Sequence, residues 1–326
     1  MLRRTLLIVS IVTVTLALVV TSFGAAAGSA LGTGVVEIQT RYGVSGGAGA
    51  GTGMVLTRSG EVLTNNHVIR GATQIRVRVP ATGRTYRARV LGYSISADVA
   101  LLRLSGSSGL QPVSLGNSST VEIGDGVTAV GNAGGTGLTA KTGSVTARGV
   151  TIRVGDGRSD TVRLSRLIET SADLREGDSG GPLLDASEQV IGMNAAATTG
   201  DVDSDGYAIP INRVRSIAAR IRAGTPTATI HVGPTPFLGI LVASRSSAPS
   251  GRVLLAGVRA GSPAARAGLG RGDALVSLNG TVIRSSSQLV ALLLRFRPGD
   301  AVRLVWTDEL GARETATVTL ASGPPQ

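Results

Sequence analysis

Short apolar runs interrupted by glycines make up most of the sequence, and this pattern limits the fold more than any other feature. Between residues 35 and 211 of the 326-residue chain, the pattern consists of alternating or short continuous apolar runs, among them VVEIQ, QIRVRV, DVALLRL and QVIGMNAA. Such runs are typical of β-strands. No helical pattern separates successive runs, so the sequence disfavours a parallel α/β sheet and predicts a mainly β fold.

The first clear helical pattern covers residues 212–223 and marks the end of a first domain. Its apolar side chains form one stripe, Asn212 can cap its beginning, and Gly224 ends it. A stretch rich in Pro, Gly and Thr follows and has the composition of a linker. We expect a first domain over residues 31–224, a linker over 225–236, and a second domain over 237–322.

The second domain combines strand patterns with two short helical patterns. Ser262 followed by proline opens the first helix, and Leu289 and Leu293 lie on one face of the second. This part of the chain is therefore expected to be α+β.

The first thirty residues have the features of an export signal. Arg3 and Arg4 precede an uncharged apolar run from Leu6 to Val20, which small residues follow at Ala25–Ala27. This order is typical of a secretory signal peptide. The uncharged stretch from Leu6 to Ala27 is also long enough, at about 20 residues, to span a bilayer as a retained anchor, so both fates stay open for residues 1–30. In either case we expect the folded part outside the cytoplasm, in the cell envelope or secreted.

Composition removes several classes of function. The chain has no cysteine and only two histidines, which excludes disulfides and a thiolate nucleophile and disfavours a metal centre. Its net charge of +11 comes from arginines spread along the chain, with Lys141 as the only lysine, and aromatic residues make up 2%. A nucleic-acid site needs clustered charge and stacking side chains, so we expect no nucleic-acid partner and no cofactor.

The stretch EGDSGGPLL, residues 176–184, is the strongest candidate for chemistry. Its central Gly-Asp-Ser-Gly-Gly fits a nucleophilic serine, Ser179, in either of two unrelated enzyme folds, and an inert turn is the third alternative. A serine needs a histidine base. An α/β hydrolase would recruit His231, which we expect to be an exposed linker residue, whereas the chymotrypsin order His, Asp, Ser selects His67, Asp98 and Ser179.

These three residues would act as a catalytic triad. His67 follows an apolar run, and Asp98 opens the run VALL, where an unpaired buried carboxylate would be costly. His67 would be general base and then general acid, Asp98 would orient it, and Ser179 would attack the carbonyl. The backbone amides of Gly177 and Ser179 would form the oxyanion hole.

Several motifs in order resemble the HtrA/DegP family of exported trypsin-like serine proteases with a C-terminal PDZ domain. They are TNNHVI, ADVALL, EGDSGGPLL, GYAIPIN, FLGI and GSPAARAGLGRGDALVSLNG. The resemblance covers about residues 35–325, and GAGTGMVLTRSGEVLTNNHVIRGAT and TIHVGPTPFLGI look especially like the actinobacterial branch of the family. It implies two six-stranded β-barrels with the triad between them, then an α+β PDZ domain; family members are often homotrimers and act in protein quality control.

The resemblance also implies a peptide groove in the second domain. Phe237, Leu238, Gly239 and Ile240 match the turn that binds a terminal carboxylate, and the helix containing Leu289 and Leu293 would form the other wall. A simple buried strand at FLGI is the alternative.

Two residues depart from the family pattern. Asp173 stands at the floor of the specificity pocket, where relatives usually have a small residue; Ala195, Ala196 and Gly206 are assigned to the same pocket. A buried carboxylate there would favour cleavage after arginine or lysine, whereas pairing with Arg175 would leave a preference for small aliphatic residues. Asp178 replaces a common asparagine, and the sequence does not identify its counter-charge.

The leading hypothesis is a serine endopeptidase that cuts unfolded or exposed segments of polypeptides. A peptide-binding or chaperone-like protein with a resting protease domain is the alternative. The acidic stretch Asp201–Gly206 matches only the first half of a calcium loop, and we interpret it as a solvated loop.

Overall fold

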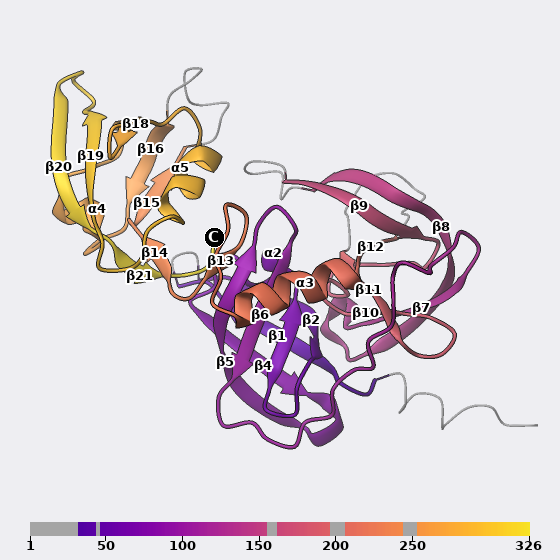
Figure 1. Ribbon diagram of the computed structural model, residues 1–326. Coiled ribbons are helices and arrows are strands. Elements are labelled where there is room, and N and C mark those ends of the chain that lie inside the picture. Colours follow the sequence, from indigo (N-terminus) through magenta and orange to yellow (C-terminus); the bar gives the residue numbers. More distant parts are fainter. Residues whose placement is uncertain (1–31, 44–45, 155–161, 196–205, 244–252) are drawn as a thin grey trace, which may run out of the picture.

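The computed structural model describes residues 32–43, 46–154, 162–195, 206–243 and 253–326 (Figure 1). It shows a mainly β protein with two barrels followed by a smaller sheet with helices, which confirms the predicted fold class. In the described part of the chain, no helix is long and apolar enough to cross a bilayer. The expected signal peptide or anchor at residues 1–30 lies outside the described residues.

The first barrel consists of six antiparallel strands. Their order is β5-β4-β1-β2-β3-β6, and pairing of β5 with β6 closes the ring. Valine, isoleucine and leucine side chains from alternate positions fill its interior. The strands are β1 (Val35–Arg41), β2 (Ala48–Val55), β3 (Glu61–Thr64), β4 (Gln74–Val79), β5 (Arg84–Ser94) and β6 (Val99–Leu104), with a short 3-10 helix η1 (Pro80–Thr82) before β5.

The second barrel is closed in the order β10-β11-β12-β9-β8-β7. It has its own apolar interior, which includes Val127, Ile168 and Leu183. Its strands are β7 (Gly126–Gly131), β8 (Thr139–Val154), β9 (Val162–Thr170), β10 (Pro182–Leu184), β11 (Val190–Ala195) and β12 (Gly206–Pro210), and a 3-10 turn η2 (Ala133–Gly135) lies between β7 and β8.

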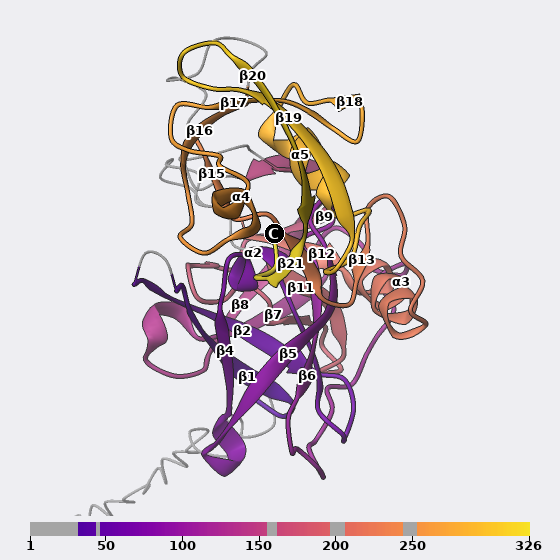
Figure 2. The ribbon, with the colours of Figure 1, turned by 90° about the vertical axis from the view of Figure 1, so that its left-hand side faces the viewer.

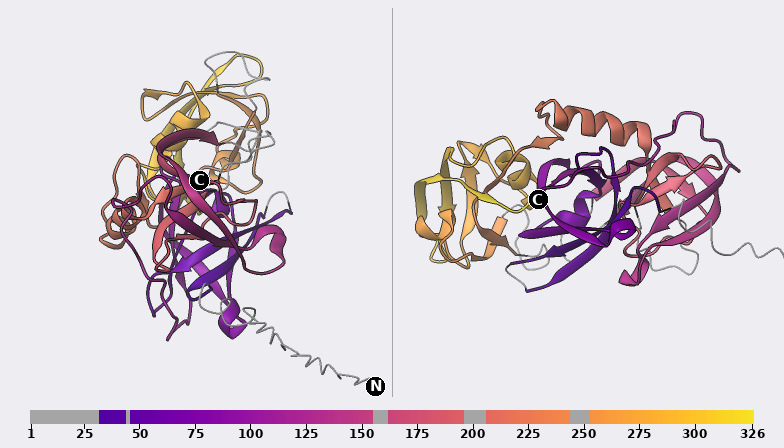
Figure 3. Two further views of the ribbon diagram at one scale, coloured as in Figure 1. Left: turned by 90° about the vertical axis from the view of Figure 1, so that its right-hand side faces the viewer. Right: turned by 90° about the horizontal axis from the view of Figure 1, so that it is seen from below.

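Helix α3 (Ile211–Arg222) joins the two barrels. It contacts β5 and β6 of the first barrel and β11 and β12 of the second, and Figure 3 shows it lying along both. At its C-terminal end, Arg222 and Arg103 both pair with the buried carboxylate of Glu61, at 2.5 and 2.7 Å. The expected cap by Asn212 is wrong: Pro210 precedes the helix, and the Asn212 amide binds Asn117 instead.

The expected linker is partly ordered into the first barrel. Strand β13 (His231–Val232) pairs with β5, opposite Tyr93. His231 is 7% exposed, and its ring packs on the Tyr93 ring with centroids 5.2 Å apart. The expectation of an exposed His231 is therefore wrong, because this residue adds a strand to the edge of a sheet.

The last part of the chain forms a sheet with two short helices, seen at the top of Figure 2. Ser262 caps the first helix by accepting a hydrogen bond from the Ala265 N–H (3.2 Å), as its position predicts. The sheet order is β15-β16-β17-β19-β20, with β18 on β17. The elements are β14 (Thr235–Phe237), β15 (Ile240–Val242), β16 (Val253–Val258), α4 (Pro263–Arg266), β17 (Ala274–Leu278), β18 (Thr281–Val282), α5 (Ser286–Leu293), β19 (Ala301–Thr307), β20 (Arg313–Thr319) and β21 (Ala321–Gly323), which pairs with β14.

The chain then returns to the first barrel. Gly71 N–H donates to Pro325 O (2.7 Å), and the Asn66 amide donates to Gln326 O (2.9 Å). Figure 1 shows the C-terminal end of the described chain beside α2 (Asn66–Ile69). The last domain is thus fixed to the barrel that carries His67.

Candidate active site

His67 and Asp98 form a close pair on the first barrel. His67 lies on the one-turn helix α2 directly after β3, and Asp98 lies in the turn before β6. His67 Nδ1 is 2.7 Å from Asp98 Oδ2, and the His67 backbone N–H donates to Asp98 Oδ1 at 2.9 Å. Both carboxylate oxygens are thus directed at His67, which leaves Nε2 as the ring nitrogen available for chemistry.

The surroundings hold Asp98 in place. Its side chain is buried, its backbone has φ of 53°, and its carbonyl accepts a hydrogen bond from the Asn65 amide at 2.9 Å. A positive φ at a non-glycine residue is strained and persists only where neighbouring contacts maintain it. The strain supports a functional reason for the aspartate at this position.

The pKa of His67 lies above its ordinary value of 6.5. Partial burial lowers the pKa of the imidazole, but the charge of Asp98 and the hydrogen bond to it raise this pKa by more, while Arg70 lowers it slightly. A base whose pKa is raised toward neutral pH is well matched to taking a proton from a serine.

Ser179 comes from the second barrel, in the loop before β10. Its carbonyl accepts a hydrogen bond from the Thr52 N–H of β2 at 2.9 Å. The next residue, Gly180, has φ of 87°, and a Cβ there would collide with Thr52 O and Thr64 Oγ1 and lie 3.2 Å from the Asn65 N atom. The loop that carries Ser179 therefore packs against the segment that leads into α2 and His67.

Three consecutive carbonyl groups are fixed in the loop before Ser179. The carbonyl of Glu176 accepts from the Gly134 N–H (3.3 Å), that of Gly177 from the Thr52 hydroxyl (2.7 Å), and that of Asp178 from the Gly181 N–H (3.0 Å). In a trans peptide the N–H of the following residue points away from the carbonyl. Fixing the carbonyls of Glu176 and Asp178 therefore also fixes the directions of the Gly177 and Ser179 N–H groups, which point the opposite way.

Asp173 lies at the surface and not in a buried pocket. Its side chain is 53% exposed and pairs with Arg175, whose Nη2 is 2.7 Å from Oδ2. The hydrogen bond from Arg175 lowers the pKa of the Asp173 carboxyl. Ala195 is buried at the end of β11, and Gly206 begins β12, where a Cβ would lie 2.7 Å from Ala172 O and 2.8 Å from Leu174 Cγ.

Two of the expected sites fall wholly or partly outside the described residues. Ala196 of the expected pocket is one, and the expected acidic loop at 201–205 is the other. Among the residues that are described, no three His, Asp or Glu side chains gather so that they could hold a metal ion.

The proposed peptide groove has an open strand edge. β15 pairs only with β16 and exposes Leu241 by 47%. Before it, Gly239 has φ of 86°, and a Cβ there would collide with Ser262 Cβ. Phe237 and Ile240 are half-buried and Leu238 is buried. Leu289 and Leu293 are 2% and 9% exposed in the core of this domain, so they leave little side-chain surface for a peptide.

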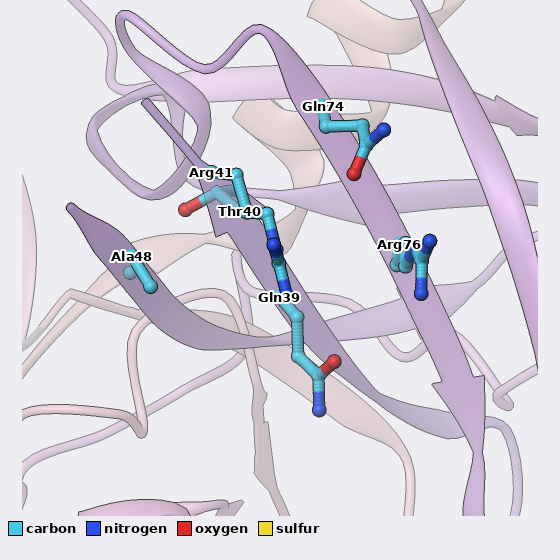
Figure 4. A pocket seen from close by; sticks show the side chains of 7 residues that line it. Gln39, Thr40, Arg41, Ala48, Gln74 and Arg76 are labelled. Atoms are coloured by element: carbon cyan, nitrogen blue, oxygen red, sulfur yellow. The ribbon is translucent and has the colours of Figure 1, made fainter. Parts of the chain in front are cut away.

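Two hollows of the described surface are lined by neither His67 nor Ser179. One, on the outer side of the first barrel, measures about 180 Å³ (Figure 4) and is lined by Gln39, Thr40, Arg41, Ala48, Gly49, Gln74 and Arg76. The other measures about 570 Å³, within the ~300–1,000 Å³ usual for small-molecule sites, and is lined by Ser94, Ser96, Ala97, Arg166, Pro210, Arg213, Ser216, Ile217, Thr229 and Ile230. A cleft for an extended polypeptide need not be deep, so the His67–Asp98 pair is the better guide to this site.

Sequence reasoning missed three residues that hold the site together. Thr52 binds the loop before Ser179, Asn65 binds the carbonyl of Asp98, and Lys141 pairs with the buried Asp178. The glycine-rich context hides Thr52, but Lys141 carried a signal, as the only lysine of the chain, while Asp178 needed a cation.

Comparisons with known proteins agree with this arrangement. Residues 51–193 match the trypsin-like peptidase domain and residues 236–319 match the PDZ domain. The chain is 32% identical over 249 residues to the periplasmic pH-dependent serine endoprotease DegQ of Escherichia coli, covering 75% of this chain and 53% of the relative. It is 33% identical over 288 residues to the serine protease PepD of Mycobacterium tuberculosis, covering 82% and 60%.

A solved structure is similar in fold over most of the chain. The HtrA-type protease AlgW with tripeptide aligns with a TM-score of 0.52 at 27% identity, covering 90% of this chain and 95% of that one. The chain spans between about half and two thirds of the length of the curated relatives above. The α/β-hydrolase alternative is wrong, because the fold is a double barrel and His231 is buried in β13. By sequence and by fold, the chain belongs to the HtrA/DegP family of trypsin-like proteases with a C-terminal PDZ domain.

Proposed function

We propose that the chain is an exported serine endopeptidase that hydrolyses peptide bonds in unfolded or exposed polypeptide segments. The observation that carries the proposal is the His67–Asp98 pair, in which a buried carboxylate receives both the ring and the backbone N–H of one histidine. A structural histidine would not require a strained aspartate on the facing turn.

In the proposed reaction, Ser179 attacks the carbonyl carbon of the substrate while His67 Nε2 takes the serine proton. Asp98 keeps the ring in the tautomer with hydrogen on Nδ1 and stabilises the imidazolium that forms. The amides of Gly177 and Ser179 donate to the tetrahedral oxyanion. His67 then gives its proton to the leaving amine, and water releases the acyl group by the reverse sequence.

The PDZ domain would bind a peptide or a free C-terminus as an extra strand on β15. Supporting this, β15 is an edge strand that carries two exposed apolar side chains, Leu241 and Val242. Backbone pairing at a sheet edge tolerates many sequences, so it suits a protease that handles diverse unfolded chains.

The surface position of Asp173 favours cleavage after small aliphatic residues. A carboxylate paired with Arg175 at the surface does not offer a buried counter-charge for lysine or arginine. Mapping the cleavage sites in a peptide library tests this point, and cuts clustered after basic residues would overturn it.

A fluorophosphonate probe tests the central proposal, since it reacts only with an activated serine. Wild-type protein should be labelled, whereas Ser179→Ala and His67→Ala should not; His231→Ala serves as the control for the second histidine. Folded wild-type protein that binds unfolded chains but takes no label at any pH would favour the chaperone-like alternative.

Cell location and assembly are further parts of the proposal. Fractionation should place the protein in the envelope or medium, and a mass measurement in solution would test for the homotrimer. The relative found in Mycobacterium tuberculosis is PepD, and similarity to PepA, the actinobacterial member suggested by two sequence stretches, stays a prediction.

A further inference from the structure

Asp178, the residue before the proposed nucleophile, is a buried carboxylate. It is 1% exposed, and its Oδ2 accepts hydrogen bonds from Lys141 Nζ and from the Arg175 N–H, the latter at 2.9 Å. Its Oδ1 has no hydrogen-bond partner among the described residues and lies where a Cβ on Gly131 would collide with it. A charged group in such a position is unfavourable unless a cation accompanies it.

Lys141 is that cation. It lies on β8 opposite Ala129 of β7, and its side chain is 19% exposed. The nearby guanidinium of Arg175 is engaged with Asp173 at 2.7 Å and points to the surface. Lys141 is therefore the side chain that neutralises Asp178, and it does so from within the same barrel.

The backbone of Asp178 sets the direction of the neighbouring amides. Its N–H donates to Arg175 O (3.0 Å) and its carbonyl accepts from the Gly181 N–H (3.0 Å). The Asp178 side chain can leave the interior only if this turn rearranges. Because Gly177 and Ser179 flank it, such a rearrangement would also redirect their N–H groups.

We propose that Lys141 is a positioning residue for catalysis: its ammonium group keeps Asp178 buried and so maintains the oxyanion hole formed by Gly177 and Ser179. The proposal rests on the proposed protease function. It also predicts that a neutral side chain at position 178 would make the cation unnecessary.

The test compares Lys141→Met, Asp178→Asn and the double variant. Lys141→Met should lower kcat about 10²-fold, the usual effect of losing one oxyanion donor, with KM for a labelled unfolded casein changed by less than threefold. Fluorophosphonate labelling should slow in parallel. The double variant should recover to within about threefold of Asp178→Asn. Arg148→Met removes a positive charge from an exposed position on the same strand and is the matched control.

The outcomes separate this proposal from the protease function itself. If folded wild-type protein takes no label, the proposed protease function is refuted. If the wild type is active and the kcat of Lys141→Met lies within threefold of the wild-type kcat, only the proposed role of Lys141 is refuted. A double variant more than tenfold less active than Asp178→Asn would also overturn the proposed role of Lys141. This comparison can be made even if Lys141→Met alone does not fold. The acidic pKa of kcat/KM, which reports His67, should be the same in Lys141→Met as in wild type.

Discussion

Replacing Thr52 with valine should damage catalysis more than folding. The Thr52 hydroxyl is fully buried, donates to Gly177 O at 2.7 Å and accepts from the Asn132 N–H at 3.0 Å. Valine has the same shape without the hydroxyl. It would leave one buried carbonyl and one buried N–H unsatisfied, each at a cost of about 1–3 kcal/mol. We expect the free energy of unfolding to fall by about 2–6 kcal/mol.

The effect on rate follows from the same bond. With its carbonyl released, Gly177 can rotate, and the neighbouring amides lose their fixed direction. Direct loss of an oxyanion donor lowers kcat by about 10²–10³. Because Thr52 acts through Gly177, we expect a fall in kcat of roughly 10–10². The assay is steady-state cleavage of labelled casein alongside urea unfolding, at a temperature where the variant is folded.

Thr52→Ser is the control for Thr52→Val. It keeps the hydroxyl and loses only a methyl group, so its kcat should stay within about threefold of wild type. Equal losses in the serine and valine variants would show that methyl packing matters and the hydroxyl does not. A destabilised valine variant with unchanged kcat would refute the link between Thr52 and the oxyanion hole.

Three further predictions concern the His67–Asp98 pair, the loop of Ser179 and the ion pairs of Glu61. Because Asp98 raises the pKa of His67, kcat/KM should rise with pH through an apparent pKa above 6.5. Protonated His67 should stabilise the fold below pH 6.5, and this stabilisation should be lost as the pH rises through the folded-state pKa of His67. Asp98→Asn should move the kinetic pKa to lower pH, and a pH profile of kcat/KM that does not move contradicts the prediction. In Gly180→Ala, the new methyl group would collide with one backbone oxygen, Thr52 O, and one hydroxyl oxygen, Thr64 Oγ1. This variant should be unfolded by circular dichroism or inactive by fluorophosphonate labelling. Gly126→Ala, which has open space around the new methyl group, should be neutral. Glu61→Gln should lower the free energy of unfolding measured with urea by about 1–3 kcal/mol. The loss should be smaller than for a fully buried ion pair, because Arg103 and Arg222 are both partly exposed. An unchanged free energy of unfolding would show that the two arginines find other partners.

The strands could be predicted from the sequence because alternation of apolar and polar residues determines which face of a strand is buried, whereas their closure into two barrels was implied by the family resemblance. The α3 helix was predicted within a residue of its bounds for a similar reason, since its stripe of Val214, Ile217 and Ile221 has the helical period. His231 could not be placed in this way. A two-residue strand has no recognisable sequence period, and its burial depends on pairing with Gly92 and Tyr93 of β5, which lie far away in the sequence.

The same limit applies to the candidate site. Order along the chain was enough to select His67, Asp98 and Ser179, because few histidines compete and the flanking motifs agree. The contacts of Thr52 and Lys141 depend instead on pairing across the barrels and within β8, at separations of many residues. No local pattern encodes such contacts.

The seam between the barrels shows why these polar contacts decide the geometry of the site. Each barrel has its own apolar interior, and apolar packing has little directional preference. Across the seam, Thr52 makes three bonds: its N–H donates to Ser179 O, its hydroxyl donates to Gly177 O, and its hydroxyl oxygen accepts from the Asn132 N–H. Within the first barrel, its carbonyl accepts from the Thr64 hydroxyl beside α2. Hydrogen bonds weaken steeply when misaligned, so these bonds fix the loop of Ser179 relative to the helix of His67. Apolar side chains of both barrels and of α3 also share one cluster, which holds the barrels together. The few buried polar atoms of the seam add the directional contacts that align nucleophile and base.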